Sequence, residues 1–218
     1  DQRVITDSGT VKAKHIIFAT HFPFLNHPGY YFARMHQERS YVLALEKAAQ
    51  LDGMYLGIDG DKLSFRNYGN YLLLGGGGHR TGENSAGGQY AHLRERAAQF
   101  YTGSTEVAHW SAQDCMTLDG VPYIGQFAAS QPHWYVATGF GKWGMTSSMV
   151  SAALISDQVA GIQHPCAEVF SPLRFTVTAS MKTLLTEMGQ AVKGIGRRVF
   201  TLPDTDVQAL RILSVKKH

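Results

Sequence analysis

Three glycines near residue 140 have the spacing of a nucleotide-binding loop. Gly139, Gly141 and Gly144 form a G-x-G-x-x-G pattern, with an apolar run before them and a helical pattern directly after them. A strand, such a loop and a helix together are the setting in which the pattern marks dinucleotide binding. Glycines let a flat ligand approach the backbone, and the start of the helix offers free N–H groups. This stretch is therefore the first candidate for chemistry in the sequence.

The loop lacks one feature of the usual dinucleotide site. That site places an acidic residue about 20 positions further on, at the end of a second strand, where it binds a ribose. The nearest acid here is Asp157, which falls inside a helix predicted from Thr146 to Val159. We therefore do not expect this loop to hold the pyrophosphate of an adenine dinucleotide. Two interpretations stay open from the residues alone: a loop against a flat anionic ligand, or a glycine turn that only joins strand to helix.

The composition is that of a folded protein without a nucleic-acid-binding surface. Of the 218 residues, 44% are hydrophobic and 17% are charged, which suffices for a buried core. The net charge of +3 arises from 20 basic and 17 acidic residues spread along the chain, so no basic stripe forms. No apolar run has the length of a membrane span.

Cysteine and histidine usage favours a reducing compartment without a metal site. Cys115 and Cys166 lie far apart, and no signal peptide precedes them, so we expect a cytoplasmic protein. The ten histidines lack the paired spacing of metal ligands, and no metal centre is expected.

Alternation of apolar and polar residues predicts a fold built mainly of strands. In the clearest case Leu63 and Phe65 face one way, while the polar residues between and around them face the other, as in an antiparallel sheet covered on one side. A hairpin is predicted at residues 4–13, strands at 15–20, 41–46, 54–58, 62–67, 71–77, 105–111 and 133–138, and helices at 90–101, 146–159 and 178–198. We expect an α+β fold with one mixed, mostly antiparallel sheet of about six strands, and close packing of the N-terminal hairpin against residues 133–175.

Two linked motifs resemble the C-terminal half of the D-amino-acid-oxidase-like flavoprotein family, which includes glycine oxidases, D-amino-acid dehydrogenases and sarcosine oxidases. The first, T-x-D-G-x-P-x-I-G, runs from Thr117 to Gly125. The second, G-[FH]-x-x-x-G-x-[TK], runs from Gly139 to Thr146 and opens the predicted helix. The resemblance extends from about Val4 to Phe175.

The resemblance implies FAD as the cofactor and oxidation of an amine or amino acid by hydride transfer to the flavin. In the family the adenine-binding fingerprint lies near the N-terminus and the late glycine loop contacts the flavin ring. Only the late loop is found in this sequence, so we expect a fragment of a longer protein, colourless and inactive by itself. The residues expected at the cofactor through backbone donors are Gly120, Gly139, Gly141, Trp143, Gly144, Met145 and Thr146.

The substrate side is less well marked in the sequence. D-amino-acid oxidases hold the substrate carboxylate with an arginine near the first motif, and none stands between Trp110 and Lys142. The candidates for contact with a small-molecule substrate are instead Arg66, His79, Arg80 and Tyr123. The sequence nominates no catalytic residue. Sarcosine oxidases bind FAD through a cysteine in a Cys-Met pair, but we interpret Cys115 as a small buried cysteine.

The expected domain organisation follows from the same resemblance. Residues 1–24 would form the tail of a Rossmann-like FAD domain, residues 25–130 the substrate domain, residues 131–175 the return to the FAD domain, and residues 176–218 a C-terminal helix and linker. The motifs also resemble the subgroup with a fused C-terminal Rieske domain, which implies a [2Fe–2S] domain as an intramolecular partner. The paired C-x-H and C-x-x-H boxes of that cluster do not occur in this chain. The alternative from another functional class is a non-catalytic binding or interaction module on the same fold.

Overall fold

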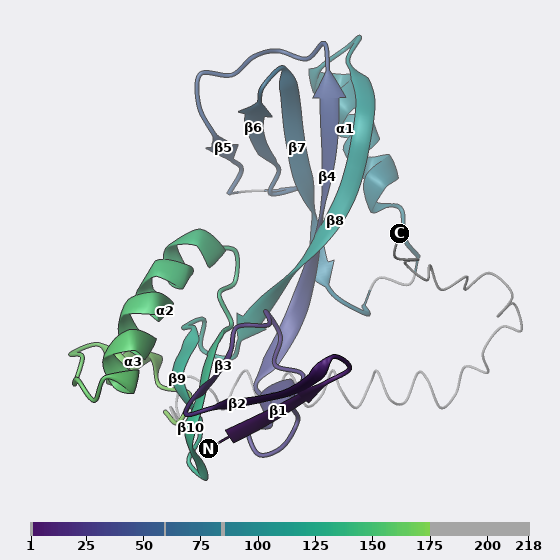
Figure 1. Cartoon of the computed structure of the whole chain (residues 1–218). Helices are drawn as coiled ribbons and strands as arrows, with labels where there is room; N and C mark the ends of the chain where they lie inside the picture. The colour runs from purple at the N-terminus through teal and green to yellow at the C-terminus, as the bar shows by residue number, and fades with distance from the viewer. Residues whose placement is uncertain (1, 59, 84–85, 175–218) are drawn as a thin grey trace, which may run out of the picture.

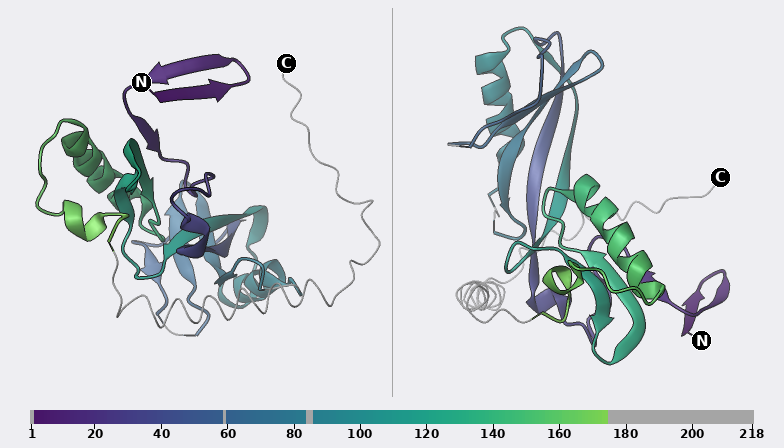
Figure 2. Two further views of the ribbon diagram at one scale, coloured as in Figure 1. Left: turned by 90° about the horizontal axis from the view of Figure 1, so that it is seen from below. Right: turned by 90° about the vertical axis from the view of Figure 1, so that its left-hand side faces the viewer.

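The computed structural model describes residues 2–58, 60–83 and 86–174 of the chain (Figure 1). Within these ranges the strands form three sheets rather than the single sheet predicted. The N-terminal hairpin consists of β1 (Gln2–Thr6) and β2 (Gly9–Ala13). Figure 2 shows the hairpin standing away from the rest of the chain, and its Ile5 side chain is 82% exposed.

A five-stranded antiparallel sheet with the order β5-β6-β7-β4-β8 forms one half of the molecule. Its strands are β4 (Met35–Glu46), β5 (Tyr55–Leu56), β6 (Ser64–Tyr68), β7 (Tyr71–Arg80) and β8 (Thr105–Thr117). Helix α1 (Gln89–Phe100) covers one face, where Leu43, Leu74 and Leu93 are fully buried. Leu63 and Phe65 belong to this covered side, as the alternation predicted. No helix of the described residues covers the opposite face (Figure 1).

A three-stranded sheet with the order β3-β10-β9 forms the other half. Its strands are β3 (Ile16–Phe18), β9 (Tyr123–Ala128) and β10 (Gln131–Thr138). β10 pairs in parallel with β3, from Trp134 against Ile16 to Val136 against Phe18. β3 and the strand before the glycine loop are therefore adjacent, as predicted. The predicted close packing of the hairpin β1–β2 itself on residues 133–175 is wrong, because the apolar side chains of the hairpin stay exposed.

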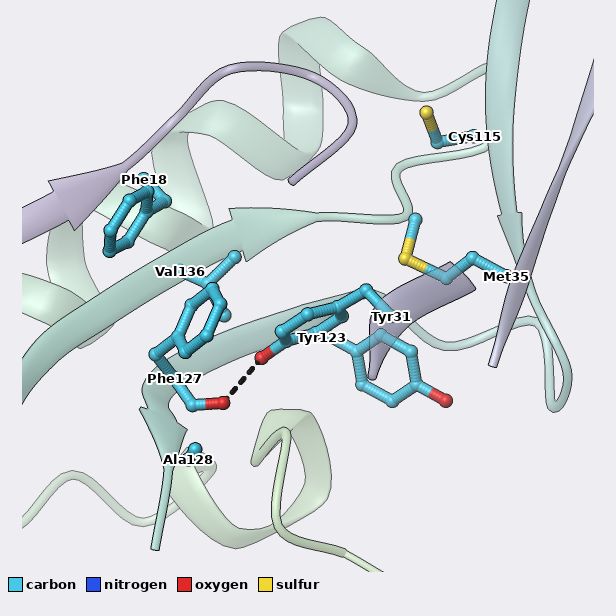
Figure 3. Close-up of a cluster of buried hydrophobic side chains, with 8 residues drawn as sticks. All are labelled: Phe18, Tyr31, Met35, Cys115, Tyr123, Phe127, Ala128 and Val136. Carbon is cyan, nitrogen blue, oxygen red and sulfur yellow. Dashed lines mark hydrogen bonds between the residues drawn. The ribbon is translucent and has the colours of Figure 1, made fainter. Parts of the chain in front are cut away.

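Two apolar clusters hold this smaller sheet in place. On one side Phe18, Phe127 and Val136 belong to one buried cluster with Tyr31 of the 3-10 turn η1 (Tyr31–Ala33), whose hydroxyl donates a 2.8 Å hydrogen bond to the carbonyl of Phe127 (Figure 3). On the other side α2 (Gly144–Val159) packs its Leu154 against Ile124 and Ala137, among others. The helix after the glycine loop is thus fixed by its apolar face.

The predicted bounds of the long strands are too short. β8 continues to Thr117 through residues predicted to form a turn-rich passage, because β4 begins at Met35 and pairs with β8 from Met35–Thr117 to Glu46–Thr105. This pairing buries Cys115 and Thr117 even though polar residues precede them.

The C-terminal part of the described chain also differs from the prediction. The segment predicted to be irregular after Pro165 contains a short helix, α3 (Ala167–Phe170). The helix predicted at residues 178–198 lies outside the described residues. None of the described helices combines the length and the apolar character needed to cross a membrane.

Candidate active site

The glycine loop is packed directly on the end of β8. Gly139 and Gly141 have positive φ angles of 74° and 54°, a conformation that glycine adopts without strain. A Cβ atom at Gly139 would lie 2.3 Å from Cγ2 of Thr117, so only glycine fits there. The N–H of Gly141 donates a 2.9 Å hydrogen bond to the carbonyl of Cys115. The course of the loop is therefore set by its contact with the strand.

The first turn of α2 leaves backbone donors without intrahelical acceptors. The N–H of Ser147 donates to the carbonyl of Trp143 at 2.9 Å, so the N–H groups of Gly144, Met145 and Thr146 precede the first helical bond. The cap residue, Trp143, makes no side-chain hydrogen bond to this end of the helix. A Cβ atom at Gly144 would meet nothing within 4 Å. The helix end is open, and its dipole favours a negatively charged ligand.

Large apolar side chains surround this helix end. Trp143 is 75% exposed and Met145 is 87% exposed. Gly120, Trp143 and Thr146 line one cavity of about 270 Å³, together with Phe140. The structure thus brings three of the predicted cofactor residues to one cavity, and the other four lie on the same loop and first turn. Donors at the edge and apolar surface at the side fit the edge and face of an isoalloxazine ring.

A buried ion pair holds the turn that contains Gly120. Arg174 donates to both carboxylate oxygens of Asp119, at 2.8 and 2.9 Å, and also to the carbonyls of Val121, Pro122 and Ser171. The two side chains are 12% and 11% exposed. Burial by itself would raise the pKa of Asp119, but the hydrogen bonds from Arg174 and from the Val121 N–H outweigh it and hold that pKa below its ordinary value. The first sequence motif is thereby tied to the segment after α3.

A second cavity of about 590 Å³ lies where the loop meets the five-stranded sheet. One wall is the tract from Gly75 to Gly78 in β7, which has no side chains. Of this tract only Gly75 pairs with β6, because β6 begins at its partner Ser64. Lys142, from the glycine loop, also lines the cavity, and its Nζ atom lies 3.9 Å from Oε2 of Glu38 in β4. The cavity therefore joins the predicted cofactor loop to the predicted substrate sheet.

Two carboxyl groups lie side by side at this junction. Glu38 and Asp114 are directly opposite each other on β4 and β8, and residues so paired point to the same face. Burial raises the pKa of Asp114, the nearby Lys142 and His21 counteract this rise, and Glu38 adds to it. The cluster holds charges of both signs next to a cavity, which suits a substrate with an amino or carboxylate group.

The four substrate candidates from the sequence do not converge on one point. His79 lines the larger cavity, with its ring stacked on Tyr41 at a centroid distance of 5.7 Å. Arg66 lines a neighbouring cavity on the open face of the sheet. Arg80 ends β7, and its Nε lies 4.0 Å from Glu83. Tyr123 is only 5% exposed and lies in the core.

The environment of Tyr123 shows what this residue does in the fold. The guanidinium groups of Arg34 and Arg174 lie 5.0 and 4.4 Å from the centre of its ring. Burial raises the pKa of its hydroxyl, while the neighbouring arginines oppose the rise. Tyr123 therefore packs the two arginines into place.

Sequence reasoning overlooked Glu38, Asp114 and Lys142. A charged residue inside the glycine loop was a usable signal for Lys142, but Glu38 and Asp114 depend on the register of β4 with β8. The thiol of Cys115 is 1% exposed and contacts the side-chain amide of Gln37, as expected of a small buried cysteine. Among the described residues, His, Cys, Asp and Glu side chains form no group of three arranged to hold a metal ion.

Comparison with known protein families identifies the family of the chain. The family model described as FAD dependent oxidoreductase (DAO) matches residues 1–158. The chain belongs to the DAO family. A relative in Bacillus subtilis (strain 168), named putative Rieske 2Fe-2S iron-sulfur protein YhfW, is 34% identical over 212 residues. The match covers 94% of this chain and 42% of the relative, so the chain spans less than half of the relative's length.

Solved structures of DAO-like proteins share the fold. Glycine oxidase from Geobacillus kaustophilus superposes with a TM-score of 0.66 at 21% identity, covering 80% of this chain and 49% of that protein. L-proline dehydrogenase from P. horikoshii gives a TM-score of 0.64 at 15% identity, covering 79% and 50% of the two chains. L-amino acid deaminase from Proteus vulgaris gives 0.60 at 19% identity, covering 79% and 46%. The α+β, mostly antiparallel architecture is thus the DAO-like fold.

The close contact between Gly139 and Thr117 predicts that a side chain at residue 139 destabilises the protein. Gly139→Ala should destabilise the protein by about 2–4 kcal/mol, because the methyl group overlaps Thr117 and the positive φ is strained. The matched Gly144→Ala variant, where a Cβ meets open space, should change the stability by no more than about 0.5 kcal/mol. In a protein that already carries Thr117→Ser, Gly139→Ala should cost less stability than it does in the wild type, because serine lacks the methyl group that the new Cβ would meet. Urea unfolding measures all four variants, and equal stability of the two alanine variants would contradict the packing of the loop.

The Asp119–Arg174 pair predicts a pH-dependent contribution to stability. The pKa of Asp119 is depressed in the folded state, so its stabilisation is fully present above the unfolded pKa of about 3.9 and is lost as the pH falls through the lower folded pKa. Asp119→Asn should cost about 3 kcal/mol at pH 7, because Arg174 stays buried with an uncompensated charge. The difference between wild type and variant should shrink below about pH 4. Urea unfolding from pH 7 to pH 3 measures it, and a difference independent of pH would show that the carboxylate charge is not the cause.

Proposed function

We propose that the protein containing this chain is an FAD-dependent oxidoreductase that oxidises an amine, an amino acid or a similar small molecule with a C–H bond next to nitrogen. The observation that carries the proposal is the cavity in which Lys142 of the glycine loop faces the Gly75–Gly78 tract of the sheet. When bound, FAD supplies the acceptor for the hydride that leaves the substrate carbon. The names of the structural neighbours, glycine oxidase and amino acid deaminase among them, support this class of substrate.

The chain's part in cofactor binding is to hold the ring rather than the adenine. The N–H groups of Gly144, Met145 and Thr146 would donate to the negatively charged edge of the ring. Gly139 and Gly141 set the course of the loop against β8, while Gly120 and the indole of Trp143 would flank the ring. These roles require backbone and apolar surface only, which the described residues supply.

The substrate would be held by the charges next to the cavity. Lys142 can neutralise a substrate carboxylate, and Glu38 can neutralise a substrate ammonium group. The raised pKa of Asp114 suits a group that accepts or releases a proton beside them. His79 lies on the same cavity, and Arg66 on its neighbour. Arg80 and Tyr123 would not contact the substrate and would act only by positioning the residues that do.

The domain limits and the larger context belong to the same proposal. The β3–β10 pairing supports residues 1–24 and 131–175 as one part of the FAD domain. Residues 25–130 would form the substrate domain and residues 176–218 a C-terminal helix and linker, although β9 pairs with β10 and so belongs to the sheet of the FAD part. The name of the Bacillus subtilis relative supports a Rieske [2Fe–2S] domain elsewhere in the protein as the electron-transfer partner. The free thiols of Cys115 and Cys166 support a reducing, cytoplasmic location.

Reduction of the flavin by an amine is the test of the proposal. The complete protein, purified with its cofactor, should lose its flavin absorbance under anaerobic conditions when a suitable amine or amino acid is added. Lys142→Met keeps the length of the side chain but removes its charge, and should slow this reduction at least about ten-fold for carboxylate-bearing substrates. Lys12→Met, in the exposed hairpin, is the matched control and should have no effect. A flavin-free protein, or a flavin that no amine reduces, would favour the non-catalytic binding module.

The division of the cofactor between this chain and the rest of the protein gives a separate prediction. Most of the affinity for FAD should come from contacts with its adenine, ribose and pyrophosphate, which the glycine loop does not provide. The 218 residues alone should therefore be colourless, inactive and prone to self-association through exposed side chains such as Trp143 and Met145. Titration with FAD followed by flavin fluorescence measures the binding. Tight stoichiometric binding would contradict the division.

A further inference from the structure

A row of residues crosses all five strands on the open face of the large sheet. Trp110 of β8 pairs with Val42 of β4, Val42 with Gly75 of β7, Gly75 with Ser64 of β6, and Ser64 with Leu56 of β5. Residues directly opposite each other in antiparallel strands point to the same side. All five therefore project from the face that α1 does not cover.

This row is shared by two adjacent cavities. Val42, Leu56, Ser64 and Gly75 line both the cavity of about 590 Å³ next to Lys142 and a second cavity of about 320 Å³. The two hollows therefore meet at the middle of the row, where Gly75 has no side chain. We define the two adjacent hollows together as the groove. Its combined size lies within the range of pockets that bind small molecules.

The two ends of the groove differ in chemistry. At the loop end it is lined by charged and polar groups that include Glu38, Ser40 and Lys142. At the other end it is lined by Met54, Tyr55 and Trp110, together with Phe65 and Leu73.

The aromatic side chains at the far end are only partly covered. Trp110 is 41% exposed and Tyr55 is 50% exposed, and the hydroxyl of Tyr55 donates a hydrogen bond to Asp52. Tyr55 pairs with Phe65 of the covered side, so Trp110 and the 82% exposed Met54 offer the apolar surface at this end of the groove. Further apolar burial is therefore available there to a ligand that reaches across the row.

We propose that the groove selects substrates with a large apolar side chain, aromatic or branched aliphatic, attached to the oxidised amine. The charged head would lie at Lys142 and Glu38, and the side chain would extend over Val42 and Gly75 onto Trp110. Arg66 lines the far end with its positive charge, which disfavours a second amino group on the substrate. This inference rests on the proposed function, because it assigns the head group to the cavity beside the flavin loop.

Two variants separate the apolar end from the head-group end. Trp110→Ala removes the aromatic wall, and Leu56→Arg places a charge at a residue that is 72% exposed, where the fold tolerates it. The matched control is Tyr68→Ala, which removes an aromatic side chain that is 69% exposed on the same sheet and lines neither cavity. Thermal unfolding of each variant shows whether the fold is retained.

The experiment uses the complete flavin-containing protein and two matched pairs of probes. The first pair is alanine and phenylalanine, each as both enantiomers, and the second is propylamine and 3-phenylpropylamine. Calorimetry gives the dissociation constants, and anaerobic bleaching of the flavin gives the rate of reduction. In the pair that binds, the phenyl-bearing probe should bind at least about ten-fold more tightly than the short one. Trp110→Ala and Leu56→Arg should remove most of that advantage while leaving the short probe and the Tyr68→Ala control unchanged.

The outcomes distinguish this inference from the proposed function. If short amines reduce the flavin but the phenyl group gives no advantage, or if the two variants leave the advantage intact, the inference is overturned and the proposed function stands. The apolar end would then be a surface covered by another part of the protein. If neither pair reduces the flavin and the phenyl-bearing probe gains no binding, both ideas fail. Binding that depends on Trp110 without reduction supports the groove and counts against oxidation of these probes.

Discussion

The contact between the glycine loop and the last residues of β8 is the constraint on which the site depends. Gly139 accommodates the methyl group of Thr117, and Gly141 donates its N–H to the carbonyl of Cys115. Because β8 also pairs with β4 over the whole length of β4, the loop has a fixed position relative to Glu38 and the Gly75–Gly78 tract. A loop from one sheet is thereby held against the face of another. Without this contact, the cofactor loop and the substrate sheet would have no defined separation, and Lys142 would have no defined place in the cavity.

Two arginines fix the loops next to the smaller sheet. Arg174 binds Asp119, and Arg34 donates to the carbonyls of Gly29 and Pro172, at 2.8 and 2.6 Å. Both guanidinium groups lie on the ring of Tyr123. The charges of Asp119 and Arg174 are tolerated at low exposure because two short hydrogen bonds join them. The arginines join segments that are distant in sequence, so the turn carrying Gly120 keeps its position beside the start of α2.

Much of the local structure could be predicted from the sequence, because local patterns determine it. The alternation around Leu63 identified the covered side of the sheet, and the glycine spacing identified the loop and the helix after it. The length of β8 could not be predicted in this way, because the pairing with β4 overrides the turn-like composition near Asp119. Tyr123 was a substrate candidate from its place in the first motif, but its ring lies between the guanidinium groups of Arg34 and Arg174, which are distant in the sequence. The Glu38–Asp114 pair required a strand register, which no local pattern specifies.

The glycine tract of β7 shows how one segment meets structural and functional demands together. Glycine weakens a strand, so four in succession need a reason at each position. A Cβ at Gly76 would lie 2.7 Å from Leu63 and 3.1 Å from Leu93, so this glycine allows α1 to approach the sheet. Gly77 has a φ of 65° at the irregularity where the pairing of β7 with β4 shifts register. Gly75 and Gly78 instead face the open side, the latter with Lys142 Nζ 3.8 Å from the position of its absent Cβ. The same tract thus lets the sheet pack closely on its covered face and leaves room for a ligand on the other, which explains why the cavity lies at this point of the strand.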